Sequence, residues 1–158
     1  MDKNFGSAAA QFSDVPETSK RRLSSIGAFP AMQQGPAARL ATEVFVPLVG
    51  GPGTLARAVA AVSAAGGNIA GYAEVSHTLH LLSEDSRAAR AALTEAGFLP
   101  TEAEVVVLAV VDLPGTAEKA FRRIAAANIN VMFSYMATDN RLVIGVGDAL
   151  EAARILND

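Results

Sequence analysis

The feature that most constrains the fold is an internal repeat of about sixty residues. The same residue types recur 62 positions apart, in the pairs Pro52 and Pro114, Gly53 and Gly115, Thr54 and Thr116, Ala58 and Ala120, Ala65 and Ala127, and Asn68 and Asn130. From Asp85 onward the offset is 63, which pairs Asp85 with Asp148 and Leu93 with Leu156. One residue inserted in a hairpin turn explains this change, because turns tolerate differences in length. The spacing predicts that one structural unit occurs twice in the chain.

Each copy shows the order strand, Gly/Pro turn, helix, two strands and helix. In the first copy these segments are the apolar run 44–49, the break 50–53, a helical stripe through Leu55, Val59 and Val62, strands at 68–75 and 79–82, and a helix over 86–96. In the second copy they are the run 105–111, the break 113–115, a stripe through Ala117, Phe121 and Ile124, strands from 129 and over 142–146, and a helix over 148–156. Gly66-Gly67 and Gly97 mark helix ends.

This order predicts an α+β protein made of two ferredoxin-like βαββαβ units, with antiparallel sheets and helices on one face. The second unit lacks its last strand, because only two residues follow Leu156, whereas residues 98–104 can supply that strand in the first unit. We therefore expect the strand at 105–111 to be covered by a strand from the N-terminal tail or from a second chain. The expected domains are a poorly ordered tail over 1–41, a first unit over 42–104 and a second over 105–158.

Composition limits the chemistry that this chain can perform. Cysteine is absent and there are two histidines, which argues against disulfides, thiolate catalysis and most metal sites. The net charge of −3 argues against a nucleic-acid partner, and no apolar run approaches the ~20 residues that cross a membrane. No nucleophile triad, P-loop or dinucleotide fingerprint is present. We expect a non-enzymatic cytoplasmic protein without cofactor, metal, nucleic acid or membrane partner.

The two turns and the segments that open the next strands resemble the ACT domain family. The second unit has Asp112-Leu113-Pro114-Gly115-Thr116 and, after a helix, Ala127-Asn128-Ile129-Asn130-Val131. The first unit has Gly51-Pro52-Gly53-Thr54 and Gly67-Asn68-Ile69, without the acid. The resemblance spans about 42–156 and is greatest to small free-standing bacterial proteins with two tandem ACT domains.

The resemblance implies a function. Members of the family mostly bind small ligands, usually amino acids, at interfaces between ACT units, and they commonly regulate amino-acid metabolism. This chain is therefore expected to be an amino-acid-binding regulatory protein that forms a homodimer or larger assembly. The alternative is a structural or dimerisation module that docks on an enzyme of amino-acid metabolism without an effector.

The turns also have a physical reason to bind a ligand. The first N–H groups of a helix lack acceptors and, with the helix dipole, favour a carboxylate. Thr54 and Thr116 would either cap their helices, the favoured reading, or donate to the ligand. Asp112 would meet an ammonium group or cap its helix, and it favours the second unit as the site because its counterpart is Gly50.

Asn68 and Asn130 would lie near the turn of a neighbouring unit, or would bond local backbone. The candidate ligand-binding residues are Pro52, Gly53, Thr54, Asn68 and Ile69 in the first unit, and Asp112, Leu113, Pro114, Gly115, Thr116, Asn130 and Val131 in the second.

The aromatic strand that follows Asn130 alternates in character. Alternation places Phe133 and Tyr135 on one face, with Met132, Ser134 and Met136 on the other. One face is expected to pack on the helices, and the other to face solvent or a second sheet. His77 and His80 lack the acidic neighbours of a metal site.

Overall fold

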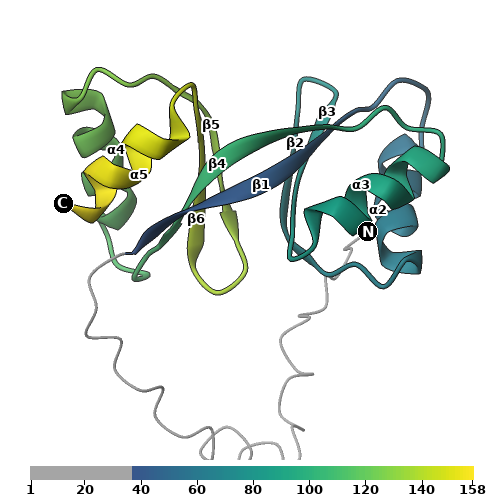
Figure 1. The fold of residues 1–158 in the computed structure, drawn as a ribbon, viewed down its shortest axis with the longest axis horizontal. Coiled ribbons are helices and arrows are strands. Elements are labelled where there is room, and N and C mark those ends of the chain that lie inside the picture. Colours follow the sequence, from purple (N-terminus) through teal and green to yellow (C-terminus); the bar gives the residue numbers. More distant parts are fainter. Residues whose placement is uncertain (1–36) are drawn as a thin grey trace, which may run out of the picture. The chain divides into compact units, whose positions relative to one another are not determined.

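The computed structural model describes residues 37–158, and the expectations for residues 1–36 lie outside this part of the chain. The described residues form one six-stranded antiparallel sheet and four helices (Figure 1). The strands are β1 (Ala38–Pro47), β2 (Ile69–Val75), β3 (Thr78–Ser83), β4 (Thr101–Ala109), β5 (Val131–Ala137) and β6 (Arg141–Val146). The helices are α2 (Thr54–Ala64), α3 (Ser86–Glu95), α4 (Thr116–Ala126) and α5 (Ala149–Asn157). The expected α+β fold is confirmed, with a single continuous sheet.

The repeat is visible in the element bounds. Helix α4 and strand β5 begin 62 positions after α2 and β2, while β6 and α5 begin 63 positions after β3 and α3. The turn before β6 holds the extra residue, since Ser76 and His77 separate β2 from β3 whereas three residues separate β5 from β6. We call residues 43–104 the first half and residues 105–158 the second half.

The sheet order β2-β3-β1-β4-β6-β5 shows how the two halves share their central strands. Strand β1 pairs with β3 over Glu43–Pro47 and with β4 from Ala38 to Phe45. The N-terminal part of β1 therefore takes the place of the strand that the second half lacks. Residues 38–41, which the sequence placed in the tail, belong to β1, because an edge with unpaired backbone groups is best covered by pairing. Of the two expected ways to cover the strand at 105–111, the structure therefore shows the first, in which the last residues of the predicted tail pair with β4.

The register reveals a pseudo-twofold relation between the halves. Thr42 pairs with Glu104 across the sheet. Glu104 lies 62 positions after Thr42, so these two paired residues are also equivalent positions of the repeat. Pairs on either side are exchanged by the same relation: Leu40 pairs with Val106, and Val44 pairs with Glu102. An axis through the Thr42–Glu104 pair, perpendicular to the sheet, therefore relates the two halves.

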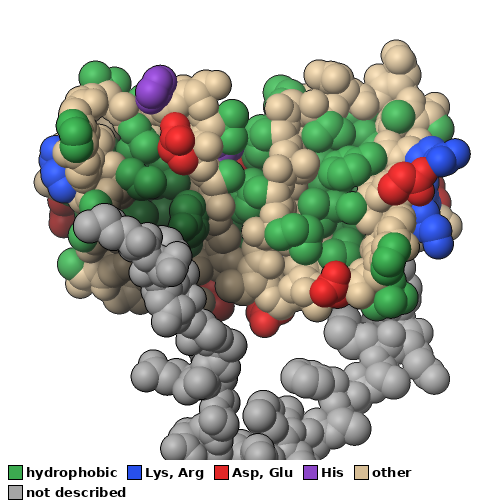
Figure 2. Space-filling model, turned by 180° about the vertical axis from the view of Figure 1, so that it is seen from behind, with side chains coloured by type: hydrophobic (Ala, Val, Ile, Leu, Met, Phe, Trp, Pro, Cys, Tyr) green, Lys and Arg blue, Asp and Glu red, His purple; other side chains and the backbone are tan. Residues whose placement is uncertain are grey.

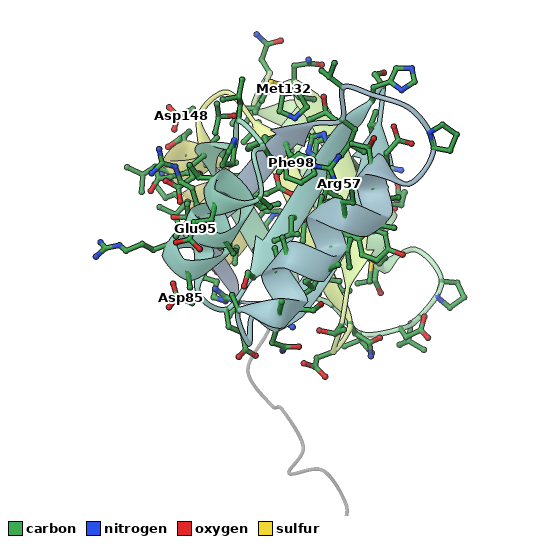
Figure 3. All side chains as sticks on the ribbon, turned by 90° about the vertical axis from the view of Figure 1, so that its right-hand side faces the viewer. Arg57, Asp85, Glu95, Phe98, Met132 and Asp148 are labelled. Carbon is green, nitrogen blue, oxygen red and sulfur yellow. The ribbon has the colours of Figure 1, made fainter. Side chains whose placement is uncertain are left out.

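One face of the sheet carries all four helices. Alternate residues of β1 face this layer: Ala38 and Leu40 pack under α4 and α5, while Val44 and Val46 pack under α2 and α3. Each half thus has its own core beneath its own helix pair. Next to the first core, the guanidinium of Arg57 in α2 lies 5.4 Å from the ring centroid of Phe98, which follows α3 (Figure 3).

The other face of the sheet encloses a third apolar cluster that joins the halves. Its members are Ala70, Leu82, Val105, Val107 and Val143, with Ala41, Phe133, Tyr135 and Ala137 packed against them. The expectation that one face of the aromatic strand packs on the helices is wrong: Phe133 and Tyr135 point into this cluster, and Met132 and Met136 are exposed. The helix side of this edge strand is covered only near its start, where Val131 packs on the second core.

The two outermost strands approach each other across the helix-free face. The Thr138 N–H donates to the Ala70 carbonyl at 2.8 Å, just beyond the end of β5. A Cβ on Gly71 would lie 2.6 Å from the Cβ of Ala137, so only glycine permits this approach. The sheet is therefore bent until its edges β2 and β5 touch at one end.

Candidate functional site

The four helices begin in two different ways, and the difference marks the candidate site. Helices α3 and α5 are capped by Asp85 and Asp148, whose side chains accept N–H groups of Ala88 and Glu151 at 2.9 Å; Asp85 is visible at the start of α3 in Figure 3. Helices α2 and α4 begin after Gly53 and Gly115, which have φ values of 92° and 87° and provide no side-chain cap. The first-turn amides of α2 and α4 consequently have no side-chain acceptor.

The turn before α2 is held by its own backbone. The Thr54 N–H and hydroxyl both donate to the Gly51 carbonyl, at 3.4 and 2.8 Å. The favoured prediction that Thr54 and Thr116 cap their helices is therefore wrong, because the cap position belongs to the preceding glycine. The amides of Leu55 and Ala56, next along the helix, are left for solvent or a ligand.

A hollow of about 250 Å³ adjoins this first-half turn. Its lining residues are Leu48, Gly50, Gly51, Gly53, Thr54, Leu55, Glu74 and His77. The Leu48 N–H donates to the His77 carbonyl at 2.7 Å, which fastens the β2–β3 turn beside the end of β1. Glu74 accepts the His77 N–H at 2.9 Å and places a carboxylate at the hollow. The hollow thus joins helix amides, which favour an anion, to a carboxylate, which favours a cation.

Sequence reasoning missed Glu74 and considered His77 only as a metal ligand. The signal that could have found them is topological: in a βαββαβ unit the second strand runs back toward the turn that ends the first strand, so the hairpin tip and the Pro-Gly turn meet.

The second-half turn differs in composition. Asp112, Leu113 and Pro114 are exposed, and the turn is closed by the Leu113 N–H donating to Val111 and the Thr116 N–H donating to Leu113. Asp112 does not cap α4, so that alternative is wrong. Where the first half has Glu74, the second half has Met136, whose side chain is 53% exposed. Near the second turn the acid is therefore Asp112 in the loop before α4, whereas near the first turn it is Glu74 in strand β2.

The two predicted asparagines lie at the far end of each half from its own turn. Helix α2, of 11 residues, separates Gly53 from Asn68 by about 16 Å along its axis. The side-chain amide of Asn68 donates to Glu84 at 3.2 Å, and its backbone carbonyl accepts the Ser83 hydroxyl at 3.0 Å. The alternative that the Asn68 side chain bonds local backbone is therefore wrong, because its amide donates to the carboxylate of Glu84.

Strand β2, which follows Asn68, contacts the second half. Two residues on, Ala70 bonds to Thr138, and the Asn140 carbonyl accepts the N–H of Val110, which leads into the second turn. Among the described residues the hydrogen bonds of Asn68 go to the first half, so its proximity to the other unit's turn stays a prediction.

Ile69 and Val131 line two separate grooves beside the helices. Ile69 lies with Leu55, Val59 and Tyr72 along a groove of about 380 Å³, and Leu55 also lines the first-half hollow. Val131 lies with Asn130 in a groove of about 420 Å³ beside Phe121 of α4. Seen from behind the view of Figure 1, the molecule shows two areas where apolar side chains gather (Figure 2).

A buried polar cluster lies away from these grooves, in the helix-free face. Glu43 is fully buried and accepts a hydrogen bond from the Tyr135 hydroxyl. Its second oxygen lies 3.7 Å from His80 Nδ1, and neither atom has a hydrogen-bond partner among the described residues. The His80 ring packs against the rings of Phe45 and Phe133, with centroids 4.9 and 4.3 Å away.

Burial dominates the protonation of this cluster. It raises the pKa of Glu43 to about 7, opposed by the hydrogen bond from Tyr135, and it lowers the pKa of His80 below the ordinary value. Burial, and then the bond to Glu43, raise the pKa of Tyr135. Near pH 7 the cluster therefore holds a neutral histidine and a carboxyl group close to its own midpoint of ionisation.

The structure offers no grouped metal ligands. Among residues 37–158, no three His, Asp or Glu side chains are arranged to hold an ion. No helix in the same range is long and apolar enough to cross a membrane.

With this geometry in view, comparison with solved structures identifies the class of fold. Protein BT0572 from Bacteroides thetaiotaomicron matches with a TM-score of 0.68 at 19% identity, over 76% of this chain and 88% of that one. The ligand-free regulatory subunit of aspartate kinase from Thermus thermophilus matches with a TM-score of 0.53 at 15% identity, over 75% and 93%. Aspartokinase III of Escherichia coli, in complex with aspartate and ADP, matches at 0.53 and 15%, over 77% of this chain and 33% of that one.

The chain therefore has the ACT-like fold of aspartate kinase regulatory domains. No protein-family model and no curated protein matches the sequence.

Proposed function

We propose that this chain is a non-catalytic regulatory protein that senses an amino acid at the turn before α2, in a site that a second copy of the chain completes as an interface between ACT-like units. The observation that carries the proposal is the first-half turn, where uncapped amides of α2 and the Glu74 carboxylate share one hollow. An amino acid presents the matching pair of charges: its carboxylate suits the helix amides and its ammonium suits Glu74.

The fold supports a regulatory role. The similar structures include regulatory subunits of aspartate kinase, and one such kinase is described with aspartate bound. A binding module of this kind acts when the ligand favours one conformation or assembly over another. A homodimer, and an enzyme of amino-acid metabolism as partner, follow from the proposal as its expected context.

Within the proposal, the residues that meet the ligand first are Gly53, Thr54 and Leu55, with Pro52 shaping the turn and Ile69 lining the adjoining groove. The corresponding second-half residues, Asp112–Thr116 with Asn130 and Val131, form a weaker candidate because no strand carboxylate stands at the position of Glu74. This reverses the preference for the second unit that Asp112 alone suggested.

A thermal-shift screen against the twenty amino acids at millimolar concentration tests the proposal. A ligand at one hundred times its Kd adds about 2.7 kcal/mol, which raises Tm by several degrees. Glu74→Gln keeps an acceptor for the His77 N–H but removes the charge, so it should abolish the shift. Glu95→Gln, an exposed carboxylate on α3, should leave it unchanged. If no amino acid raises Tm, the proposal of an amino-acid sensor is rejected, and the alternative of a structural module without an effector is favoured.

A further inference from the structure

The N-terminal part of β1 has one side paired with β4 and the other side open. Strand β3 covers β1 only as far as Glu43, which pairs with Leu82, while β1 continues to Ala38. The space beyond the end of β3 is a cleft of about 560 Å³, within the size range of ligand sites. Its lining residues are Arg39, Leu40, Ala41, Thr42, Ala70, Leu82, Ser83, Glu84, Ser86 and Arg141. We call it the β1 cleft.

Backbone hydrogen bonds show which β1 groups point into the β1 cleft. The Ala37 carbonyl accepts the Ala109 N–H of the β4 side, whereas the N–H and carbonyl of Ala38 both bond to the side-chain amide of Asn157, at 2.8 and 2.9 Å. Because these directions alternate along an antiparallel strand, the N–H and C=O groups of Leu40 and Thr42 also point away from β4. Leu40 lies beyond the end of β3. Thr42 adjoins the Glu43–Leu82 pair, which places its carbonyl opposite the Ser83 N–H and leaves its own N–H outside the β1–β3 register.

The side chain of Asn157 shows which kind of group can bond to the open edge of β1. Its amide donates and accepts at Ala38 as a peptide group of an adjacent strand would, so the open edge is already bonded at its first position. Next in the same direction among the described residues, the N–H and C=O of Leu40 and the N–H of Thr42 are available to continue the ladder. An extended peptide would satisfy these groups.

The charges around the β1 cleft favour an acidic occupant. Arg39 makes no ion pair or hydrogen bond with any described residue. Arg141 is 20% exposed, and its guanidinium donates to the carbonyl and hydroxyl of Thr138. It also lies 3.4 Å from the carboxylate of Asp139, an exposed side chain outside the cleft lining, which neutralises part of its charge. The one carboxylate in the lining, Glu84, accepts the Asn68 amide. Both arginines stand on the helix-free side of their strands, so they flank the edge from one face.

The equivalent open edge in the second half has the opposite charge. Strand β6 pairs with β4 only from Val106 to Ala109, so the backbone groups of Glu102 and Glu104 face outward there. Their side chains are exposed, and Glu102 lies 3.8 Å from Arg90. Among the described residues the repeat therefore provides two open edges. Arg39 and Arg141 line the cleft at the edge in β1, whereas two glutamates stand on the edge in β4, where Arg90 pairs with one of them.

We propose that the β1 cleft binds an extended acidic peptide of a partner protein, which adds a strand to residues 39–42 while Arg39 and Arg141 hold its carboxylates. This site is separate from the first-half turn, so it stands whether or not an amino acid binds there. The backbone ladder would supply affinity, and the arginines would select acidic sequences.

Hydrogen exchange and fluorescence anisotropy on the full chain test the proposal with the peptide (Val-Glu)₄ as probe. In the free chain, the amides of Leu40 and Thr42 should exchange quickly, while that of Ala41, directed at β4, is protected. The probe should slow exchange at Leu40 and Thr42 at least tenfold and leave Ala41 unchanged. Arg39→Ala should weaken binding about tenfold, while Arg122→Ala, an exposed arginine on α4, should have no effect.

Four results would overturn the proposal. Protection of Leu40 and Thr42 without any probe would mean that the chain itself fills the edge. Equal binding of (Val-Lys)₄ would remove the selection for acids. Equal protection by millimolar free glutamate would make the cleft a small-molecule site. Unchanged binding of a fully N-methylated (Val-Glu)₄, which cannot donate backbone hydrogen bonds, would exclude strand addition.

Discussion

The two halves agree closely on the helix-covered face of the sheet and differ on the other. Under the helices, buried positions keep their character: Leu93 corresponds to Leu156, and Val44 to Val106. On the helix-free face, Glu43, Phe45 and His80 of the first half correspond to three valines of the second, Val105, Val107 and Val143. Gly71 and Ala73 of β2 correspond to Phe133 and Tyr135 of β5.

This difference shows how a repeat can fill one shared interior with two unlike sets of side chains. The large residues of β5 reach across to Glu43, Phe45 and His80, whereas the small residues of β2 leave room for the edges to meet. Close packing requires such compensation, because an interior tolerates neither voids nor excess volume. The halves are therefore equivalent in fold and unequal in their chemistry.

The largest expected effect comes from Glu43, a buried acid of the first half whose counterpart in the second half is Val105. The pKa of Glu43, raised to about 7 by burial, lies above its ordinary value, so the folded state binds more protons between pH 4.5 and 7. The free energy of unfolding should then fall by about 3 kcal/mol as pH rises through this range. His80, whose pKa is lowered, acts in the opposite sense and costs stability as pH falls below 6.5.

Glu43→Gln separates the two contributions, since the amide keeps the bond from Tyr135 and does not ionise. The stability of the variant relative to the parent should grow by about 3 kcal/mol between pH 4.5 and pH 8. Urea unfolding at a series of pH values measures this. Parallel curves for parent and variant would show that Glu43 does not titrate with a raised pKa.

A smaller loss of stability should follow from placing a side chain at Gly145, where the ring of Phe133 packs against the backbone. A Cβ on Gly145 would lie 2.1 Å from the ring of Phe133, while the counterpart position in the first half holds Leu82. Gly145→Ala should therefore cost about 2 kcal/mol through overpacking. Gly147→Ala is the matched control, because nothing lies within 4 Å of that position. Equal denaturant midpoints for the two variants would refute the asymmetric packing.

The smallest effect should come from the side chain that bonds the shared part of β1. Asn157→Ala removes both bonds to Ala38 and should cost about 1 kcal/mol. The counterpart in the first half, Thr94, bonds only to Arg90 in its own helix, so Thr94→Ala should change little. Amide exchange at Ala38, measured alongside unfolding, should accelerate in the first variant alone. Unaltered exchange there would mean that β1 does not depend on α5.

Much of the fold could be predicted because the repeat and the Pro-Gly turns are local sequence features. The offsets located the helices and strands of both halves, and the missing last strand predicted that something must cover β4. That residues 38–41 do so could not be read from their composition, since Arg39, Leu40 and Ala41 have no strand periodicity of their own. Their conformation is imposed by pairing with β4.

The candidate site was predictable only in part. The uncapped turns follow from Gly53 and Gly115, but Glu74 enters through the return of β2 to the turn, which is a tertiary relation. The cluster of Glu43, His80 and Tyr135 was missed for the same reason, because 92 positions separate the acid from the tyrosine that bonds to it. The alternation of side chains predicts which residues of a strand share a face. It does not predict that the helix-free face of the sheet encloses a buried cluster.

The most direct test of an amino-acid sensor with unequal halves is an NMR titration of the uniformly ¹⁵N-labelled chain with each amino acid that raises its Tm. The account predicts that the amides of Leu55 and Ala56, at the start of α2, shift with saturable dependence on ligand, and that those of Ala117 and Glu118, their counterparts in α4, shift less or not at all. Shifts confined to the start of α4, or absent from both helix starts, would contradict it.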